Sequence, residues 1–451
     1  MNKRRLIIGL GVVVLLVLVA GAFVARKALQ AIQGDEVLSG LEESIPQPIG
    51  PLEPIGAGQA DWPCWRGPNS NGISPVTGIR TDWSGGLKKL WEVNYLCQGS
   101  RSATWSAPVV RGNRLVVPGR DKSNDLVFCL DPETGALLWT QSYRAVIRIP
   151  KHGPGSRATP YIDEDRVYTF GQRGDLACWN LADGAPLWRS NVEDTGGDAP
   201  TWGHASSPLV YGDKVFVQGG GKALIVAYDK MTGTVAWKAL EGTAGYAAIT
   251  PLRVGETTML LVFHGTGLVC LDPASGKVLW DVPWETSYDV NATTPVVAGQ
   301  TIFITSGYGT GGQALRIENG KPEILWRSRA IAAHHSDPAI IDGFLYGYSG
   351  QSNQNSGRFK CLELDSGAEK WTTNEIGWGT FVQVDGHLLC QDIKGNLFLI
   401  KPDPNAFTKV TEMKAALGEA TSPAWTVPTV ANGKLYLRYM QRLICYDLIN
   451  E

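Results

Sequence analysis

The stretch LDPETGALLW (130–139) recurs along the chain as WNLADGAPLW (179–188), YDKMTGTVAW (228–237), LDPASGKVLW (271–280) and LELDSGAEKW (362–371). Each copy has a glycine four residues before a tryptophan and an Asp, Asn or Glu four residues before that glycine. Such residues between two apolar runs favour a tight hairpin, because Asp or Asn caps the turn and Gly adopts positive φ. Each copy therefore predicts two antiparallel strands, with the tryptophan on the second.

The tryptophan of this phrase belongs to a series that runs through most of the chain at intervals of 43 to 49 residues. A repeat of this length indicates one structural unit copied around a ring or along a rod. We expect these side chains to be buried between sheets and to dock each unit onto the next. The series comprises Trp91, Trp139, Trp188, Trp237, Trp280, Trp326 and Trp371.

A second hairpin precedes the phrase in each unit. Dipeptides such as Gly112-Asn113 and Asn432-Gly433 separate short apolar runs, and a proline lies just before the first run, where its missing N–H is tolerated. The unit is thus predicted to be a four-stranded antiparallel sheet. Counting one marker for each unit predicts eight units: Pro108, Pro160, Pro208, Pro251, Pro295, Pro338, Phe381 and Pro428.

Four-stranded sheets repeated radially form a β-propeller, whereas a stack of hairpins would form a solenoid. The two ends of the repeat region favour the propeller. The last unit ends the chain after three strands, and an orphan strand, LKKLWEV (87–93), precedes the first complete unit. We predict an all-β, eight-bladed propeller in which residues 87–93 form the outer strand of the last blade and remove an open edge.

The chain divides into four parts: 1–27, 28–60, 61–86 and the propeller 87–451. Residues 6–25 are 20 uncharged, mostly apolar residues, enough for a helix that spans a bilayer core. We expect a transmembrane signal anchor rather than a cleaved signal peptide, although Ala20-Gly21-Ala22 could serve as a cleavage site. Basic residues before the apolar run outweigh those after it, which predicts a single-pass protein of the inner membrane with its propeller on the periplasmic side. Residues 28–60 contain several prolines and glycines and are interpreted as a tether.

The composition gives no sign of a nucleic-acid partner, because Lys and Arg (41) balance Asp and Glu (43) for a net charge of −2. Five of the eight cysteines occupy one position of the repeat and would lie on different sheets, too far apart for disulfides. We interpret them as small buried apolar residues. They are Cys129, Cys178, Cys270, Cys361 and Cys445. Cys64 and Cys97 lie outside this pattern, and a disulfide bond between them is an open alternative.

The residues just before each innermost strand are predicted to surround one mouth of the channel. Aromatic faces and a few polar groups in a concave place are typical of a ligand site. The alternative is a polar, water-filled mouth whose side chains satisfy one another. The predicted mouth residues are Trp105, Arg157, His204, Asn291, His334, His335, Trp378 and Trp425, with Trp202 and Tyr288 slightly further upstream.

Adjacent residues on a strand point to opposite faces, so the pair His334-His335 does not predict a metal site. No catalytic residue is predicted. Outside the ring, DWPCWRGPNSNGIS (61–74) is interpreted as a loop that plugs or staples the scaffold, with Trp62 and Trp65 covering apolar surface.

The repeated D-x-x-T/S-G-x-x-x-W phrase resembles the tryptophan-docking motif of the eight-bladed propellers related to quinoprotein alcohol dehydrogenases. It is also similar to that of the propeller lipoprotein of the outer-membrane β-barrel assembly machinery, BamB. The leading DWPCWRGP phrase resembles exported propellers of the pyrroloquinoline-quinone-binding-like repeat family. The resemblance covers residues 61–448 and implies the fold. The dehydrogenases carry two adjacent cysteines against the quinone, calcium ligands and an aspartate base, and this chain has no Cys-Cys dipeptide. The lipid-bearing cysteine of the assembly lipoprotein is also missing behind the apolar run.

The leading hypothesis is a membrane-tethered, monomeric propeller that binds envelope proteins or peptides as a scaffold. One alternative is an oxidoreductase dependent on pyrroloquinoline quinone and calcium, with alcohols or sugars as substrates. Another is a glycan-binding propeller in which Trp105, Trp378 and Trp425 stack on sugar rings. No cofactor is predicted under the leading hypothesis.

Overall fold

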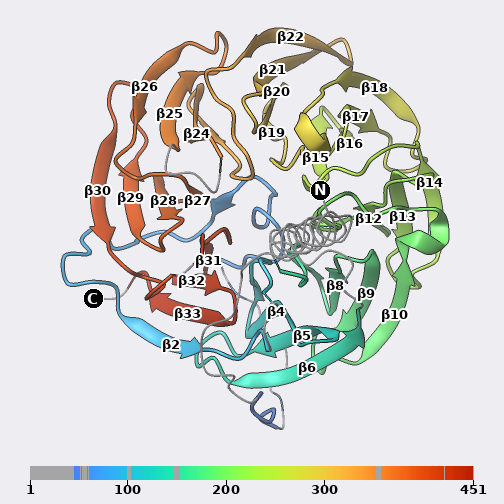
Figure 1. The fold of residues 1–451 in the computed structure, drawn as a ribbon, viewed down its shortest axis with the longest axis vertical. Coiled ribbons are helices and arrows are strands. Elements are labelled where there is room, and N and C mark those ends of the chain that lie inside the picture. The colour runs from blue at the N-terminus through green and yellow to red at the C-terminus, as the bar shows by residue number, and fades with distance from the viewer. Residues whose placement is uncertain are drawn as a thin grey trace, which may run out of the picture.

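Eight antiparallel sheets surround a central axis in the computed structural model of the protein (Figure 1). The structure describes residues 45–449 apart from 51, 53–57, 59, 99–102, 146–152, 352–356 and 421. In each sheet the first strand lies next to the axis and the fourth lies on the outside of the ring (Figure 1). The prediction of an eight-bladed propeller of four-stranded blades is confirmed.

Each of the first four blades contains four consecutive strands. Blade 1 has β3 (Val109–Arg111), β4 (Arg114–Arg120), β5 (Asn124–Leu130) and β6 (Leu137–Arg144). Blade 2 has β7 (Tyr161–Asp163), β8 (Arg166–Phe170), β9 (Asp175–Asn180) and β10 (Pro186–Asn191). Blade 3 has β11 (Leu209–Tyr211), β12 (Lys214–Gln218), β13 (Ile225–Asp229) and β14 (Val235–Ala239). Blade 4 has β15 (Thr250–Val254), β16 (Thr257–His264), β17 (Gly267–Leu271) and β18 (Val278–Pro283).

The remaining blades follow the same plan, and the last two also take up strands from the start of the chain. Blade 5 has β19 (Val296–Ala298), β20 (Thr301–Ser306), β21 (Gly311–Glu318) and β22 (Lys321–Ser328). Blade 6 has β23 (Ala339–Ile341), β24 (Phe344–Ser349), β25 (Arg358–Glu363) and β26 (Glu369–Thr373). Blade 7 has β27 (Gly379–Val384), β28 (His387–Asp392), β29 (Leu397–Lys401) and β30 (Thr408–Met413), with β1 (Ile73–Ser74) beside β27. Blade 8 has β31 (Thr429–Ala431), β32 (Lys434–Tyr439), β33 (Arg442–Asp447) and β2 (Lys89–Val93). Two short 3-10 helices, Val192–Thr195 and Ser287–Asp289, follow β10 and β18.

The ring closes as predicted. Strand β2 pairs antiparallel with β33, so that Trp91 lies opposite Cys445. In the other six tryptophan-bearing blades, the residue opposite the repeat tryptophan is also a cysteine or an alanine; for example, Trp139 lies opposite Cys129. A strand from the start of the chain therefore covers the edge that blade 8 would otherwise expose.

The repeat tryptophans lie on the outer strands and reach the next blade. The indole of Trp139 donates a hydrogen bond to the Leu181 carbonyl at 3.0 Å and lies over Gly184. Five of the other six make the same type of bond, and Trp280 is the exception, with a buried indole N–H for which the structure shows no acceptor. Burial differs from the expectation. Trp91, Trp139 and Trp280 are buried, but Trp188, Trp237, Trp326 and Trp371 are only half-buried. These tryptophans lie on the outermost strand of each blade, where one side of the strand faces solvent.

Apolar clusters lie between successive sheets, and the repeat cysteines belong to this core. All eight cysteines are buried free thiols, and the five repeat cysteines lie on the third strands at 0% exposure. Their interpretation as small core residues is confirmed. Cys64 and Cys97 form no bridge, since the Cys64 thiol donates to the Gly67 carbonyl and the Cys97 thiol contacts Thr104 and Met440.

The segment 61–74 crosses the centre of the ring, and we call it the plug (Figure 1). It begins beside the first hairpins of blades 1 and 8, where the Asp61 carboxylate accepts bonds from the Gly112 amide and the Asn432 side chain. Trp62 then pairs with Val110, and the plug ends as β1, parallel to β27. This fifth strand of blade 7 was not anticipated, since two residues carry no sequence signal of their own.

The anchor predicted at residues 6–25 lies outside the described residues, as does most of the tether. Within the part of the chain that the structure describes, no helix has the length and apolarity needed to span a membrane.

Candidate binding site at the channel mouth

A cavity of about 490 Å³ lies at the channel mouth, on the side where the innermost strands begin. Most of its lining comes from segments that directly precede those strands, so the repeat itself brings them together. Five of the eight predicted mouth residues line it: Trp105, Arg157, His334, His335 and Trp425.

Three predicted mouth residues do not reach this cavity. The imidazole of His204 is buried against Phe170, with ring centroids 5.0 Å apart, and burial lowers its pKa to about 4, so it is neutral at physiological pH. Trp378 is buried in the cluster between blades 6 and 7. Asn291 is fully buried and acts as a clamp: its amide donates to the His264 and Gly265 carbonyls, at 2.7 and 3.2 Å.

Several residues that line the cavity lie outside the positions predicted from the repeat. Tyr308 and Gln351 lie at the ends of second strands, in hairpins that also surround the mouth, and Tyr246 precedes blade 4. Trp202, which was placed slightly upstream, lines the cavity, whereas Tyr288 is not among its lining residues. The inner hairpins vary in length and carry no common phrase, so the repeat pattern could not find Tyr308 or Gln351.

The aromatic rings form a continuous path from solvent to the cavity interior. Tyr288 is 69% exposed, and its ring centroid lies 5.7 Å from that of Tyr308. From Tyr308 the path continues through His334 (5.0 Å), His335 (4.6 Å), Trp425 (5.5 Å) and Trp105 (5.0 Å). Tilted and edge-on contacts at these distances are favourable aromatic packing.

Backbone strain occurs at the outer end of this path. Tyr288, Asp289 and Tyr308 all have positive φ, at 62°, 57° and 56°. A residue with a Cβ adopts this conformation at an energetic cost, and such residues concentrate at functional sites. The three strained residues therefore mark the rim of the mouth as part of the candidate site.

The cavity wall contains one cationic side chain that is held in position. The Arg157 guanidinium donates to the Trp202 carbonyl and, at 3.2 Å, to the Gly153 carbonyl. Burial raises the pKa of the Tyr246 phenol to about 12, so this lining group stays neutral. Among the described lining residues there is no carboxylate, lysine or cysteine. The site therefore suits ligands with flat apolar groups and neutral or negative charge.

The plug forms the floor of the cavity. The Trp65 indole lines this cavity and also a small one of about 30 Å³ on the plug side, and it donates to the Thr294 hydroxyl at 2.8 Å. The Thr294 amide donates to Asp337 at 2.7 Å, and Asp337 pairs with Arg66 of the plug at 3.0 Å. A buried ion pair thus joins the plug to the mouth segment that precedes blade 6.

Polar side chains from second strands hold the mouth segments in place. Gln218 of blade 3 donates to the Ala247 carbonyl at 2.8 Å, and Gln391 of blade 7 donates to the Thr426 carbonyl at 3.2 Å. Arg438 of blade 8 donates to the Ser106 carbonyl at 3.0 Å and to Thr104. Each bond joins a blade to the segment that enters the next one, which makes the cavity wall rigid.

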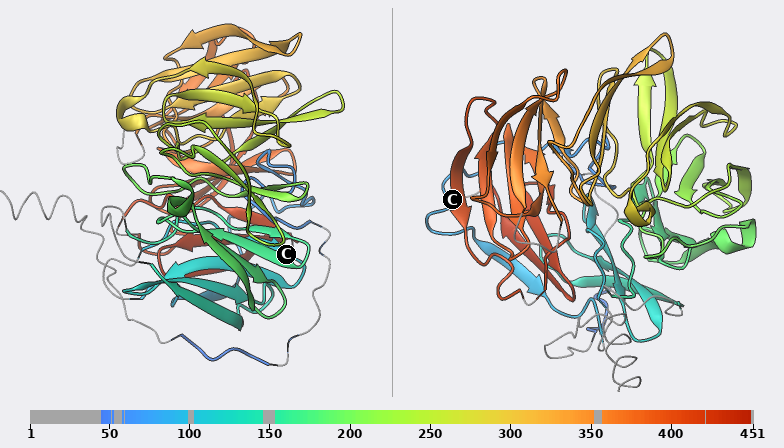
Figure 2. Two further views of the ribbon diagram at one scale, coloured as in Figure 1. Left: turned by 90° about the vertical axis from the view of Figure 1, so that its right-hand side faces the viewer. Right: turned by 45° about the horizontal axis from the view of Figure 1, so that its top comes forward.

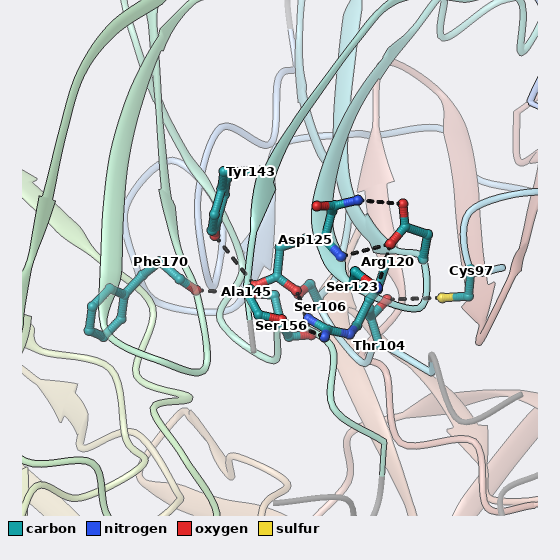
Figure 3. Close-up of polar contacts among 12 residues, drawn as sticks. Cys97, Thr104, Ser106, Arg120, Ser123, Asp125, Tyr143, Ala145, Ser156 and Phe170 are labelled. Atoms are coloured by element: carbon teal, nitrogen blue, oxygen red, sulfur yellow. Dashed lines mark hydrogen bonds and ion pairs between the residues drawn. The ribbon is translucent and has the colours of Figure 1, made fainter. Parts of the chain in front are cut away.

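A second buried polar network lies between blades 1 and 2 (Figure 3). Arg120 pairs with Asp125 at 2.6 Å and donates to the Ala145 carbonyl at 2.7 Å, while the Tyr143 hydroxyl lies 3.5 Å from Asp125. Burial raises the pKa of Asp125 to about 6, although the Arg120 guanidinium opposes the shift. This network stabilises the wall beside the mouth and is not part of the cavity lining.

The described residues do not fit a quinone bound together with a cation. The aromatic walls and Arg157 would suit a planar anionic ring system, but the described lining offers no carboxylate for a calcium ion. Nowhere in the described ranges do three or more His, Cys, Asp or Glu side chains gather in a metal-binding group.

Known structures share this architecture at low sequence identity. BamB from Moraxella catarrhalis superposes with a TM-score of 0.57 and 14% identity, over 80% of this chain and 100% of that one. The quinohemoprotein alcohol dehydrogenase from Comamonas testosteroni superposes with a TM-score of 0.61 and 13% identity, over 88% of this chain and 81% of that one. The computationally designed protein Ika8 gives a TM-score of 0.54 and 13% identity, over 80% of this chain and all of that one. At such identities these likenesses show the fold alone.

A comparison with curated protein sequences gives no significant match. The family described as outer membrane protein assembly factor BamB matches residues 123–373, which is more than half of the chain. Together with the eight-bladed architecture and its repeated tryptophan docking, this match shows that the chain belongs to that family.

Proposed function

We propose that this protein is a binding propeller of the cell envelope that takes up an extended segment of a partner protein at its channel mouth. Residues 6–25 would anchor it in the inner membrane, with the propeller on the periplasmic side. The family is named for an assembly factor, which supports a protein partner. The proposal depends mainly on one observation: the aromatic path that leads from Tyr288 at the rim to Trp105 inside the cavity.

The chemistry of the lining favours a peptide over the other ligands considered. Proline and aromatic side chains pack well on tilted aromatic faces, and backbone carbonyls of a peptide can accept from Arg157 and Gln351. A glycan could stack on the same aromatic faces, but the described lining offers its hydroxyl donors no carboxylate acceptor. A quinone-dependent oxidoreductase would require a cation site that these residues do not form.

Site-specific photocrosslinking tests the proposal. A benzoylphenylalanine in place of Tyr308, 37% exposed at the rim, should capture defined envelope proteins through one short stretch of each, identified by mass spectrometry. The matched control is Tyr211, which is 40% exposed but lies in the first hairpin of blade 3, away from the mouth. Trp425→Ala should abolish the adducts at position 308. The variant should still unfold cooperatively, at a melting temperature lowered by the lost packing on Trp105 and His335.

Two outcomes would contradict the proposal. Equal capture from positions 308 and 211 would show that the mouth has no preference for a partner. Capture that survives Trp425→Ala would show that the aromatic path takes no part in binding. Dye reduction after addition of quinone and calcium, lost on Arg157→Ala, would favour the oxidoreductase.

A further inference from the structure

The described part of the predicted tether, residues 45–50 and 52, lies outside blade 1 (Figure 2). In the stretch IPQPIGPL (45–52), the Ile49 amide donates to the Leu137 carbonyl at the start of β6, at 2.8 Å. Leu52 packs against the apolar cluster that contains Leu138, and Ile45 packs against the cluster that contains Leu137. A stretch rich in proline and aliphatic residues thus contacts this edge through Ile45, Ile49 and Leu52.

The outer strands of the complete blades share the local geometry that receives this segment. In blades 1 to 6 the pairing of the third and fourth strands shifts by one residue just before the repeat tryptophan, which produces a β-bulge. The residues two and one positions before the tryptophan are therefore equivalent from blade to blade. They are Leu137-Leu138 in blade 1, Pro186-Leu187 in blade 2, Val235-Ala236 in blade 3, Val278-Leu279 in blade 4, Ile324-Leu325 in blade 5 and Glu369-Lys370 in blade 6.

The side chains at these positions are buried in blade 1 but partly exposed to solvent in the next four blades. Leu137 and Leu138 are 2% and 5% exposed in blade 1, where the tether covers them. The apolar residues at the same positions in blades 2 to 5 remain open to solvent: Leu187 41%, Val235 45%, Leu279 43% and Ile324 60%. Four neighbouring edges thus present the surface that blade 1 keeps covered.

Blades 6 and 8 have protected edges instead. At the same positions blade 6 has Glu369 and Lys370, and Glu369 pairs with Lys360 at 2.7 Å. Blade 8 has Lys89, which pairs with Glu92 at 2.8 Å. Charged residues on an edge strand oppose the addition of a further chain. Blade 7 has Lys409 and Val410 at the equivalent positions, and Val410 is 39% exposed beside the charged Lys409. Blades 2 to 5 are therefore the neighbouring blades whose exposed apolar residue has no charged residue beside it at these two positions.

We propose that the outer edges of blades 2 to 5 are docking sites for an extended partner segment in which prolines alternate with aliphatic residues. Blades 4 and 5 match blade 1 most closely, because Val278-Leu279 and Ile324-Leu325 reproduce its aliphatic-leucine pair. Such a segment is pre-extended, so it loses little conformational entropy on binding. It needs to donate only one backbone hydrogen bond, as Ile49 does on blade 1. These edges are separate from the channel mouth and do not depend on the function proposed for it.

A peptide with the protein's own sequence provides the probe. A biotinylated peptide of residues 43–54, ESIPQPIGPLEP, is added to the intact protein with benzoylphenylalanine at Leu279. The matched control has the same group at Lys370, the equivalent position of blade 6. We expect about tenfold more adduct at position 279 than at 370, which corresponds to ~1.4 kcal/mol of preference.

A second peptide shows whether aliphatic contacts drive the binding. Replacing the isoleucine and leucine that correspond to Ile49 and Leu52 by serine should reduce the adduct at position 279 to the level of the control. Equal adducts at positions 279 and 370, no adduct at 279, or an adduct that survives the serine replacements would each overturn the proposal.

Discussion

Single residues hold neighbouring blades together through a contact between an indole and a glycine. A Cβ placed on Gly184 would lie 2.6 Å from a ring carbon of Trp139, and the φ of Gly184 is +76°. The phrase therefore needs glycine for two separate reasons, its backbone conformation and the space taken by the previous blade's tryptophan.

Two glycine substitutions separate these reasons. Gly184→Ala should lower the free energy of unfolding by about 2–4 kcal/mol, because it adds left-handed strain and a clash with Trp139. Gly212→Ala should cost only about 1–2 kcal/mol, because Gly212 also has positive φ but has nothing within 4 Å of its would-be Cβ. Urea unfolding of both variants measures the difference. Equal losses would mean that backbone conformation alone explains the glycine.

Asp125 makes stability depend on pH. Its pKa rises from about 4 in the unfolded chain to about 6 in the fold, mainly through burial, so the folded protein binds this proton more tightly. Its contribution is therefore fully present below about pH 4 and is lost as the pH rises through about 6, a change on the order of 3 kcal/mol. Asp125→Asn should flatten the stability profile between these values in urea titrations. Parallel profiles for the two proteins would contradict the assignment.

At the level of elements, one short strand decides whether the ring is closed. Strand β2 supplies Trp91, whose indole donates to the Pro132 carbonyl of blade 1 at 3.0 Å, and it also pairs with β33 of blade 8. It therefore connects the last blade to the first. No other described strand joins the two ends of the repeat in this way, so its loss should affect both neighbours.

Two truncated chains that differ only in β2 test this role. Residues 87–451 retain the strand and residues 94–451 lack it, while both lack the tether and the plug. The shorter chain should be less stable by at least about 3–5 kcal/mol, the cost expected for loss of Trp91 alone. Hydrogen exchange should show faster exchange of β33 amides in the shorter chain. Equal protection of β33 in the two chains would exclude closure by β2.

At the scale of the whole molecule, the plug joins blades that are far apart in sequence. It is held by the Arg66–Asp337 ion pair, in which both side chains are nearly buried, at 7% and 11% exposure. Breaking a buried pair from one side is costly because the remaining charge has lost its partner. We therefore expect this pair to contribute strongly to holding the plug in place.

The rate of thiol labelling reports opening of the plug, because Cys64 lies within it. Arg66→Met should weaken the plug by about 3 kcal/mol and accelerate labelling of Cys64 about a hundredfold. The double variant Arg66→Met/Asp337→Leu removes both charges and should recover most of the protection. The control variant Cys64→Ser lacks this thiol, so the labelling that disappears in it is the labelling of Cys64. Unchanged labelling in Arg66→Met would show that the ion pair does not hold the plug.

Sequence patterns were enough to predict the number of blades, the four-stranded unit and the closure of the ring. These features depend on local turn chemistry and on a regular period, both of which can be seen in short stretches such as 130–139. The glycine that needs positive φ and the tryptophan four residues later act within one hairpin and its neighbour. Local rules are therefore enough to predict them.

The residues that line the mouth, in contrast, depend on how the blades pack against one another. Trp105 and Trp425 meet at 5.0 Å although they belong to opposite ends of the propeller region, and the plug's Trp65 reaches Thr294. His204 and Asn291 fit the mouth pattern but turn into the interior. Whether a side chain at a repeat position faces the cavity or the core depends on packing between blades, and the period carries no information about that packing.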